Sequence, residues 1–280
     1  MRLALRIEVG SEKGALEGVP VLLRLLDEHQ VKASFFFSLG PDYTRYPFAH
    51  LIPTLIRQRL PVSYIGRRCR DNLLAVANAG HDIGLSSFTA LDWQRDVAFR
   101  TAAWTHNEMA RAVENFTGLF GREPRYYAAR GWQVNPHLLT EEEGYGFEFA
   151  SDVRGHHIFL PELQGALSRC PQIPTTLPTL DELLSQEEIN QDNLHQYLYA
   201  ACQRIMPNGE VFSLSAEREG GELLKVFERL LVMWKGGQWE IRSLSELFGR
   251  IGQAPLKRHR IGWGTVAGET RHLAMQSSAL

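Results

Sequence analysis

The chain has 280 residues, of which 44% are hydrophobic and 22% are charged, and its formal net charge is −2. This composition is typical of a soluble globular protein with one large α/β domain or two small ones. A basic excess is absent, which argues against nucleic-acid binding. No apolar run approaches the ~18 residues that cross a bilayer. No signal-peptide pattern is present, and three widely spaced cysteines suggest no disulfide framework, so we expect a cytoplasmic protein.

Strands and helices alternate along most of the chain. Apolar residues alternate with other side chains over residues 3–9, which predicts a first strand. Glu8 and Gly10 lie at its C-terminal end. Further strands are expected at 32–37, 81–86, 125–129, 147–150, 172–173, 210–214 and 239–241. Helices are expected at 20–29, 71–79, 93–117, from 136 onward, and at 194–206, 222–234 and 244–251. Uninterrupted strand–helix units favour a parallel sheet in one barrel-like domain, followed by a polar tail that is disordered at its end.

Residues 43–68 combine bulky apolar side chains and prolines with several arginines, among them Arg57, Arg59, Arg67 and Arg68. One interpretation is a core helix that the prolines break. The other is a surface segment with apolar and cationic faces that lies on an anionic membrane. The sequence leaves both interpretations open.

Six separated segments, in order, resemble the NodB-type polysaccharide deacetylases, also called carbohydrate esterase family 4. They are Leu5–Val9, Phe35–Asp42, Ala129–Trp132, Ser151–Gly155, Gln172–Thr179 and Ala216–Gly220. Within that family the chain is most similar to the deformylases of the lipid A aminoarabinose pathway. The resemblance implies a distorted (β/α)7 barrel over residues 1–268, with 269–280 as a C-terminal tail. It also implies the removal of a formyl group from an amino sugar carried on undecaprenyl phosphate.

The family binds a divalent metal such as zinc through one aspartate and two histidines, and uses another aspartate as base and a late histidine as acid. In this chain Glu8 corresponds to the base, and Gly10, Ser86 and Ala90 correspond to the metal ligands. Ser215 corresponds to the acid, and a serine is no general acid near pH 7. Glycine, serine and alanine are poor replacements for zinc ligands, so we expect no metal cofactor.

Other residues of these motifs are candidates for substrate binding. Asp152 and Arg154 either pair for structural reasons or hold sugar hydroxyls or a phosphate. Trp132 either stacks on a sugar ring or packs under its loop. Gln133, which replaces a family arginine, and Glu217 complete the set of substrate-binding candidates.

A relocated metal site is an alternative that uses the adjacent histidines His156 and His157. Neighbouring loop histidines commonly point in different directions into solvent, which argues against this alternative.

Three functions remain open. The first is a non-catalytic homologue of the deformylases that binds a lipid-linked amino sugar, or an active paralogue or pathway enzyme, in envelope polysaccharide modification. The second is an active carbohydrate amide hydrolase with a relocated metal or a metal-free mechanism. The third is a purely structural interaction protein. In the first case we expect the protein at the inner face of the cytoplasmic membrane, with residues 43–68 in peripheral contact.

Overall fold

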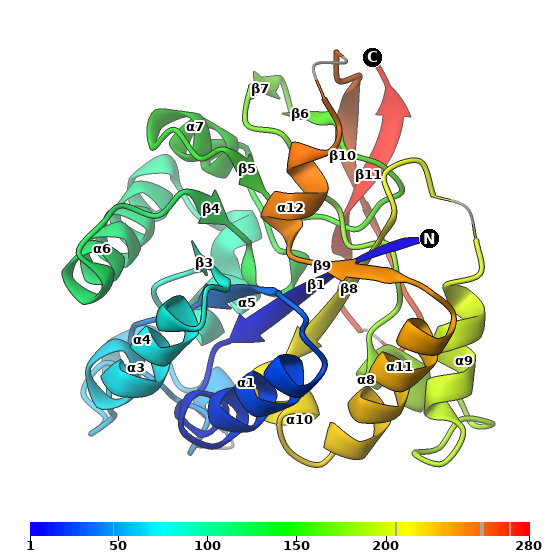
Figure 1. Ribbon diagram of the computed structural model, residues 1–280. Helices are drawn as coiled ribbons and strands as arrows, with labels where there is room; N and C mark the ends of the chain where they lie inside the picture. The colour runs from blue at the N-terminus through cyan, green and yellow to red at the C-terminus, as the bar shows by residue number, and fades with distance from the viewer. Residues whose placement is uncertain (47, 205, 253–254, 269) are drawn as a thin grey trace.

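Strand β1 (Arg2–Val9) is an interior strand of a parallel sheet that curls into a partial barrel (Figure 1). The computed structural model describes residues 1–46, 48–204, 206–252, 255–268 and 270–280. Within this part of the chain the sheet has seven strands. Their order is β5 (Phe149–Ala150), β4 (Tyr126–Tyr127), β3 (Asp82–Leu85), β2 (Ser34–Phe37), β1 and β8 (Glu210–Ser215), with β9 (Glu240–Arg242) also paired to β1. The predicted α/β barrel is confirmed, and its strands correspond to the NodB (β/α)7 type.

The register of β1 positions the site. Glu8 lies opposite Phe36 of β2 on one side and opposite Ser215 of β8 on the other. The carboxyl ends of parallel strands meet at one edge, so two positions 207 residues apart in the chain become neighbours there. Strand β2 is buried along its whole length, as its run of phenylalanines predicts.

Helices cover the sheet in most of the expected places. They are α1 (Val19–Glu28), α4 (Arg70–Asn78), α5 (Ala90–Asp96), α6 (Ala102–Phe120), α7 (Pro136–Gly144), α8 (Leu180–Leu184), α9 (Leu194–Ala201), α10 (Ala216–Glu219), α11 (Leu224–Gly236) and α12 (Leu244–Gly249). Short turns η1 (Gly14–Gly18), η3 (Val97–Phe99) and η4 (Arg130–Trp132) lie between them. Asn135 caps α7 by accepting from the Leu138 N–H, as predicted.

Two sequence predictions about these elements are wrong. Residues 93–117 do not form one helix, because the chain turns after η3 and Thr101 starts α6 as its N-cap, accepting from the Trp104 N–H. Residues 172–173 form only an isolated bridge from Gln172 to Ala150 and another to Phe159. The predicted helix 194–206 ends at Ala201, and residue 205 lies outside the described residues.

A second sheet, which the sequence analysis does not predict, packs above the barrel (Figure 1). Its order is β11 (Leu273–Ala279), β10 (Arg258–Gly264), β6 (Leu160–Leu163) and β7 (Ala166–Leu167). The expectation of a disordered end is therefore wrong. Strand β11 pairs with β10, and its Gln276 N–H donates to the Arg154 carbonyl over 2.7 Å. The expected domain boundary falls beside residue 269, which lies outside the described residues.

Residues 43–68 form short pieces instead of one broken core helix. They contain η2 (Ala49–Leu51), α2 (Thr54–Arg57) and α3 (Ile65–Arg68), and residue 47 lies outside the described part. Exposed apolar side chains alternate with buried ones: Leu55 is 80% exposed, whereas Ile65 is 1% exposed. None of the helices in the described part of the chain has the length and hydropathy that crossing a membrane requires.

Arg57 does not belong to the surface of this segment, contrary to the sequence interpretation. Its guanidinium is fully buried, forms an ion pair with Asp92 of α5, and donates to the carbonyls of Ala49 (2.9 Å) and Ile52 (3.2 Å). A buried charge needs such partners to offset its desolvation. Arg57 therefore fastens the segment to the barrel, while Arg59, Arg67 and Arg68 face solvent.

Candidate functional site

A pocket of about 350 Å³ opens at the carboxyl ends of β1 and β8. Its lining includes four of the sequence candidates: Glu8, Trp132, Ser215 and Glu217. The other lining residues are Gln94, Arg130, Gly131, Thr179, Asp181, Ser213, Leu214, Arg218 and Glu219. We call this cavity the Glu8 pocket.

Two guanidinium groups hold the carboxylate of Glu8. Arg6 Nη1 donates to Oε1 over 2.5 Å, and Arg130 Nη1 donates to Oε2 over 2.5 Å. Burial by itself would raise the pKa of Glu8, but the charges and hydrogen bonds of Arg130 and Arg6 bring that pKa below its ordinary value. Glu8 is therefore ionised at neutral pH, and both oxygens are engaged. A carboxylate in this state is a weak proton acceptor, so the environment disfavours a role as general base.

The guanidinium of Arg130 occupies the space beside Gly10. A β-carbon on Gly10 would lie 3.0 Å from both Cζ and Nη1 of Arg130, closer than side-chain packing normally allows. A carboxylate at position 10 would therefore meet the guanidinium of Arg130 instead of an open metal position. Ser86 is buried, and Ala90 begins α5 with a methyl group in place of a ligand.

These residues do not fit the divalent metal that the family resemblance implies. Glycine and alanine supply no donor atom, and a serine hydroxyl is a weak ligand for zinc. Among the residues that the structure describes, no group of three or more histidine, cysteine, aspartate or glutamate side chains is placed to hold a metal ion.

Arg6 stabilises the site from inside the sheet. It is fully buried, and its Nη1 also donates to Ser213 Oγ over 2.7 Å. Its guanidinium lies 5.6 Å from the ring of Trp132, and the guanidinium of Arg154 lies 4.8 Å from the same ring. Trp132 Nε1 donates to Thr175 Oγ1 over 3.1 Å. Trp132 is thus packed between two cations and lines the pocket with only a small exposed part.

Glu219 lies beside the Ser215 position. Its Oε2 accepts from the Ser215 N–H over 2.7 Å, and burial raises the pKa of Glu219 to about 8. Glu217 has a different environment, because Ser11 Oγ donates to its Oε2 over 2.6 Å and Lys13 lies 4.0 Å from its Oε1. One neutral acid and one hydrogen-bonded carboxylate therefore flank the position of the family's catalytic acid.

Asp152 and Arg154 lie away from the Glu8 pocket and do not pair with each other. Asp152 is fully buried, and its oxygens accept from the Ala129 N–H (2.6 Å) and from Gln172 Nε2 (2.6 Å). Arg154 forms an ion pair with Glu182 over 2.6 Å. The same Glu182 side chain completes the capping box of α8. Both side chains thus make structural contacts, but the expected pair of Asp152 with Arg154 is wrong, because each is engaged by other partners.

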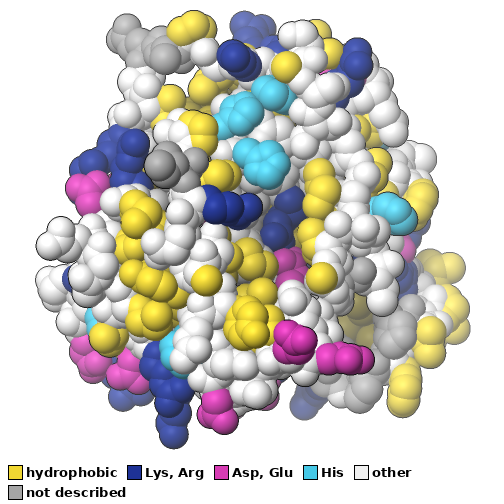
Figure 2. Space-filling model, turned by 90° about the vertical axis from the view of Figure 1, so that its right-hand side faces the viewer, with side chains coloured by type: hydrophobic (Ala, Val, Ile, Leu, Met, Phe, Trp, Pro, Cys, Tyr) yellow, Lys and Arg dark blue, Asp and Glu magenta, His cyan; other side chains and the backbone are white. Residues whose placement is uncertain are grey.

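Gln133 and the two histidines also lie outside the Glu8 pocket. Gln133 Nε2 donates to the His272 carbonyl over 2.8 Å, which ties η4 to the start of β11. His157 Nε2 faces His259 Nε2 over 3.1 Å instead of His156. Histidine side chains gather on the upper part of the face in Figure 2, at the height at which Figure 1 draws β10 and β11. None of the residues that line the Glu8 pocket is a histidine, so His156 and His157 supply no relocated ligand there.

Comparison with known proteins agrees with this architecture. The model of the polysaccharide deacetylase family matches residues 7–150, about half of the chain. The ArnD protein of Shewanella sediminis (strain HAW-EB3), described as a 4-deoxy-4-formamido-L-arabinose-phosphoundecaprenol deformylase, is 31% identical over 267 residues. The match covers 88% of this chain and 85% of the relative. The chain belongs to the polysaccharide deacetylase family.

Solved structures of the polysaccharide deacetylase family share the fold. A Mycobacterium smegmatis protein described as a polysaccharide deacetylase superposes with a TM-score of 0.67 at 15% identity, and the match covers 89% of each chain. The Bacillus anthracis protein BA3943, described as a CE4 family pseudoenzyme, superposes with a TM-score of 0.57 at 14% identity. That match covers 92% of this chain and 69% of BA3943.

Sequence reasoning missed Arg6 and Arg130, the two residues that determine the state of Glu8. The signal for Arg6 is its spacing, because residues two apart on a strand share a face and Arg6 precedes Glu8 by two. Arg130 follows β4 and meets Glu8 across 122 residues of sequence, so no local pattern reveals that contact.

We expect that restoring the three metal ligands fails while Arg130 is present. The variant Gly10→Asp, Ser86→His, Ala90→His should bind Zn²⁺ at least tenfold more weakly than the same variant with Arg130→Ala, because the guanidinium neutralises the new carboxylate and repels the metal. Titration calorimetry measures both affinities. Arg125→Ala, at the exposed start of β4, is the matched control and should not increase Zn²⁺ binding. Equal affinities with and without Arg130 would contradict the role assigned to its guanidinium.

Glu219 should make the folded state less stable as pH rises. Its pKa is about 8 in the folded state and near 4.5 in the unfolded state, so unfolding releases a proton between these values. The free energy of unfolding should then fall from about pH 4.5 to about pH 8, by at most about 1.4 kcal/mol per pH unit from this group. Urea titrations of wild type and Glu219→Gln isolate the contribution, since the amide still accepts from Ser215 N–H. Parallel pH curves for the two proteins would contradict this prediction.

Proposed function

We propose that this member of the polysaccharide deacetylase family binds an undecaprenyl-phosphate-linked amino sugar in the Glu8 pocket and does not hydrolyse its amide. The observation that carries the proposal is the contact of Arg130 with Glu8 and Gly10. One guanidinium fills the space beside residue 10 and engages the carboxylate that corresponds to the base. The similarity to a phosphoundecaprenol-linked sugar deformylase supports the ligand class.

The Glu8 pocket remains a binding cavity, but it lacks the family's metal ligands and its histidine acid. The Glu8 pocket keeps serine, threonine and acidic side chains that can bond to sugar hydroxyls. Arg6, Glu8 and Arg130 together carry one net positive charge, and Asp181, Glu217 and Arg218 of the same pocket add one net negative charge. The acid position holds Ser215, whose hydroxyl stays protonated and offers no proton to a leaving amine near neutral pH.

Binding and catalysis can be tested together. We expect the wild-type protein to bind a short-chain prenyl-phosphate formamido sugar in titration calorimetry and to release no formate above the rate without protein. Ser215→Phe fills the pocket and should lower the affinity at least tenfold. Val232→Phe, on the exposed side of α11, is the control and should leave it unchanged. Formate release that is abolished by Glu8→Gln would overturn the non-catalytic function, and equal affinity of the two phenylalanine variants would overturn binding at this site.

Peripheral membrane contact is part of the same proposal. Phe48, Leu51, Leu55 and Ile56 are between 58% and 80% exposed in the segment that carries the exposed Arg59, Arg67 and Arg68. Apolar groups beside cations favour the interface of an anionic leaflet, where each cation contributes about 1 kcal/mol.

We expect salt-sensitive binding to phosphatidylglycerol-containing vesicles. Replacing Arg59, Arg67 and Arg68 with glutamine should reduce co-sedimentation at low salt several-fold. The control variant replaces Arg122, Arg169 and Arg229 with glutamine. These arginines are exposed in other parts of the chain, so the control removes the same amount of charge. Equal loss in both variants would mean that net charge alone drives binding, and loss in neither would contradict membrane contact by residues 43–68.

A further inference from the structure

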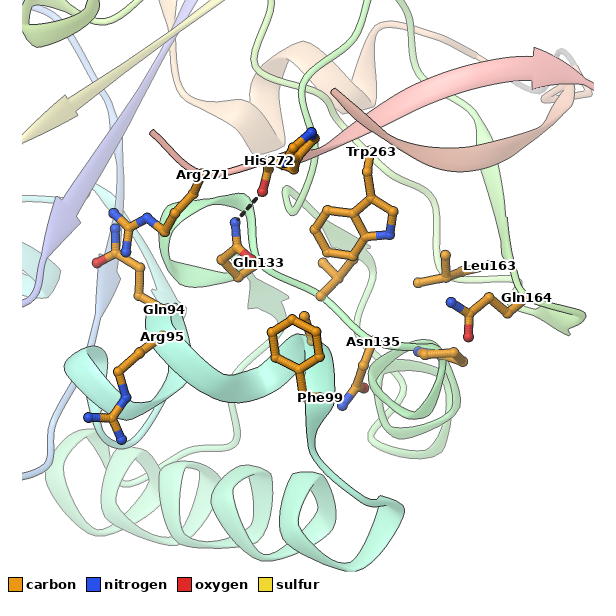
Figure 3. Close-up of a pocket in the computed structure, with 13 residues that line it drawn as sticks. Gln94, Arg95, Phe99, Gln133, Asn135, Leu163, Gln164, Trp263, Arg271 and His272 are labelled. Atoms are coloured by element: carbon orange, nitrogen blue, oxygen red, sulfur yellow. Dashed lines mark hydrogen bonds between the residues drawn. The ribbon is translucent and has the colours of Figure 1, made fainter. Parts of the chain in front are cut away.

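A second cavity, of about 610 Å³, lies between the barrel and the second sheet. Its walls are mainly apolar and come from Ala98, Phe99, Val134, Pro136, Leu163 and Trp263. Figure 3 shows Phe99 and Trp263 facing the same space, with Leu163 at the far side. We call this cavity the apolar pocket. Its volume is in the range of ligand-binding pockets. The sugar of the proposed ligand occupies the Glu8 pocket and leaves the apolar pocket without an assigned ligand.

The apolar pocket adjoins the Glu8 pocket. Gln94 lines both cavities. The turn after β4 separates them, because Arg130, Gly131 and Trp132 line the Glu8 pocket while the next residues, Gln133 to Pro136, line the apolar pocket. A ligand that occupies both cavities would pass over Gln94, whose side chain packs against Gly131 of this turn.

Charge is distributed unevenly around the apolar pocket. Arg271 and Gln94 lie together on the side toward β1 in Figure 3, whereas Trp263 and Leu163 lie away from it. Beyond Gln94 the Glu8 pocket holds both cationic and acidic side chains, so the cationic edge of the apolar pocket is the one at Arg271. An occupant with an anionic group followed by a hydrocarbon chain matches this order of cationic edge and apolar interior.

The rim of the apolar pocket continues into exposed apolar surface. Phe99 lines the pocket and is 90% exposed. The helix α2, which carries the exposed Leu55 and Ile56, is fastened to α5 through the Arg57–Asp92 ion pair and the bond from Arg95 Nη2 to Thr54 Oγ1 (3.4 Å). A hydrocarbon chain that leaves the pocket past Phe99 thus finds further apolar side chains on the same side of the barrel.

We infer that the apolar pocket binds the first isoprene units of a polyprenyl phosphate, with the phosphate held at the edge formed by Gln94 and Arg271. This inference rests on the proposed function, since the sugar then lies in the Glu8 pocket. The remaining isoprene units leave over Phe99 toward the membrane. A free sugar or a soluble nucleotide sugar would leave these apolar walls without a partner.

Farnesyl phosphate is a direct probe of the apolar pocket, because it carries an isoprenoid chain and a phosphate but no sugar. Titration calorimetry should detect its binding, and Ala98→Trp, which fills the pocket, should lower the affinity at least tenfold. Ala103→Trp on the exposed side of α6 is the matched control and should bind like wild type. Phe99→Ser changes an exposed side chain, so it should leave folding intact and weaken binding about threefold.

The phosphate and the chain are tested separately. Arg271→Gln should weaken farnesyl phosphate at least fivefold and leave farnesol unchanged. Inorganic phosphate at millimolar concentration should fail to displace farnesyl phosphate. Equal affinity of the two tryptophan variants, or full displacement by inorganic phosphate, would overturn the inference.

The same variants distinguish this inference from the proposed function. If Ala98→Trp blocks farnesyl phosphate while the wild-type protein shows no preference for the sugar-bearing ligand, the apolar pocket is confirmed and sugar binding in the Glu8 pocket fails. If Ser215→Phe abolishes binding of the sugar-bearing ligand while Ala98→Trp has no effect on either ligand, sugar binding is supported and the isoprenoid site fails.

Discussion

The bond between Arg130 and Glu8 governs the candidate site. A buried carboxylate is stable as an anion only when positive groups offset its desolvation, and here two guanidinium groups do so. In a metal-dependent hydrolase the divalent ion would supply much of that positive charge. The polysaccharide deacetylase fold of this chain instead carries an internal cation, and that cation engages the carboxylate and fills the adjoining space. The state of Glu8 and the accessibility of residue 10 both depend on this one contact.

The second sheet changes what the barrel can bind. Strands β6 and β10 contribute Leu163 and Trp263 to a wall that the barrel lacks by itself, and the bond from Gln133 to the His272 carbonyl fixes that wall to η4. The barrel thus supplies polar groups at its strand ends and the second sheet supplies apolar surface beside them. An amphiphilic ligand is the class of molecule that uses both.

Sequence reasoning succeeded where the signal is local. Alternation in β1, the phenylalanine run of β2 and the Asn135 cap each reflect nearby residues. The position of Glu8 followed from its strand end, whereas Ser215 was identified through the family resemblance. It failed where distant segments meet. The strands β6 and β7 are only four and two residues long; β7 pairs with β6, and β6 pairs with β10, about a hundred residues later. Arg57 resembled a surface arginine because its partner Asp92 lies in another element, and Arg130 gave no hint of its contact with Glu8.

The fit between Gly10 and Arg130 also bears on how such a site can change over time. An acidic side chain at position 10 would pair with the guanidinium of Arg130 instead of a metal ion, and loss of the guanidinium alone leaves the buried Glu8 with one partner fewer. The effect of a change at either position thus depends on the residue at the other, so the two positions are epistatic. A lineage that carries both residues regains no metal site by either single substitution, so selection for catalysis has no first step to act on.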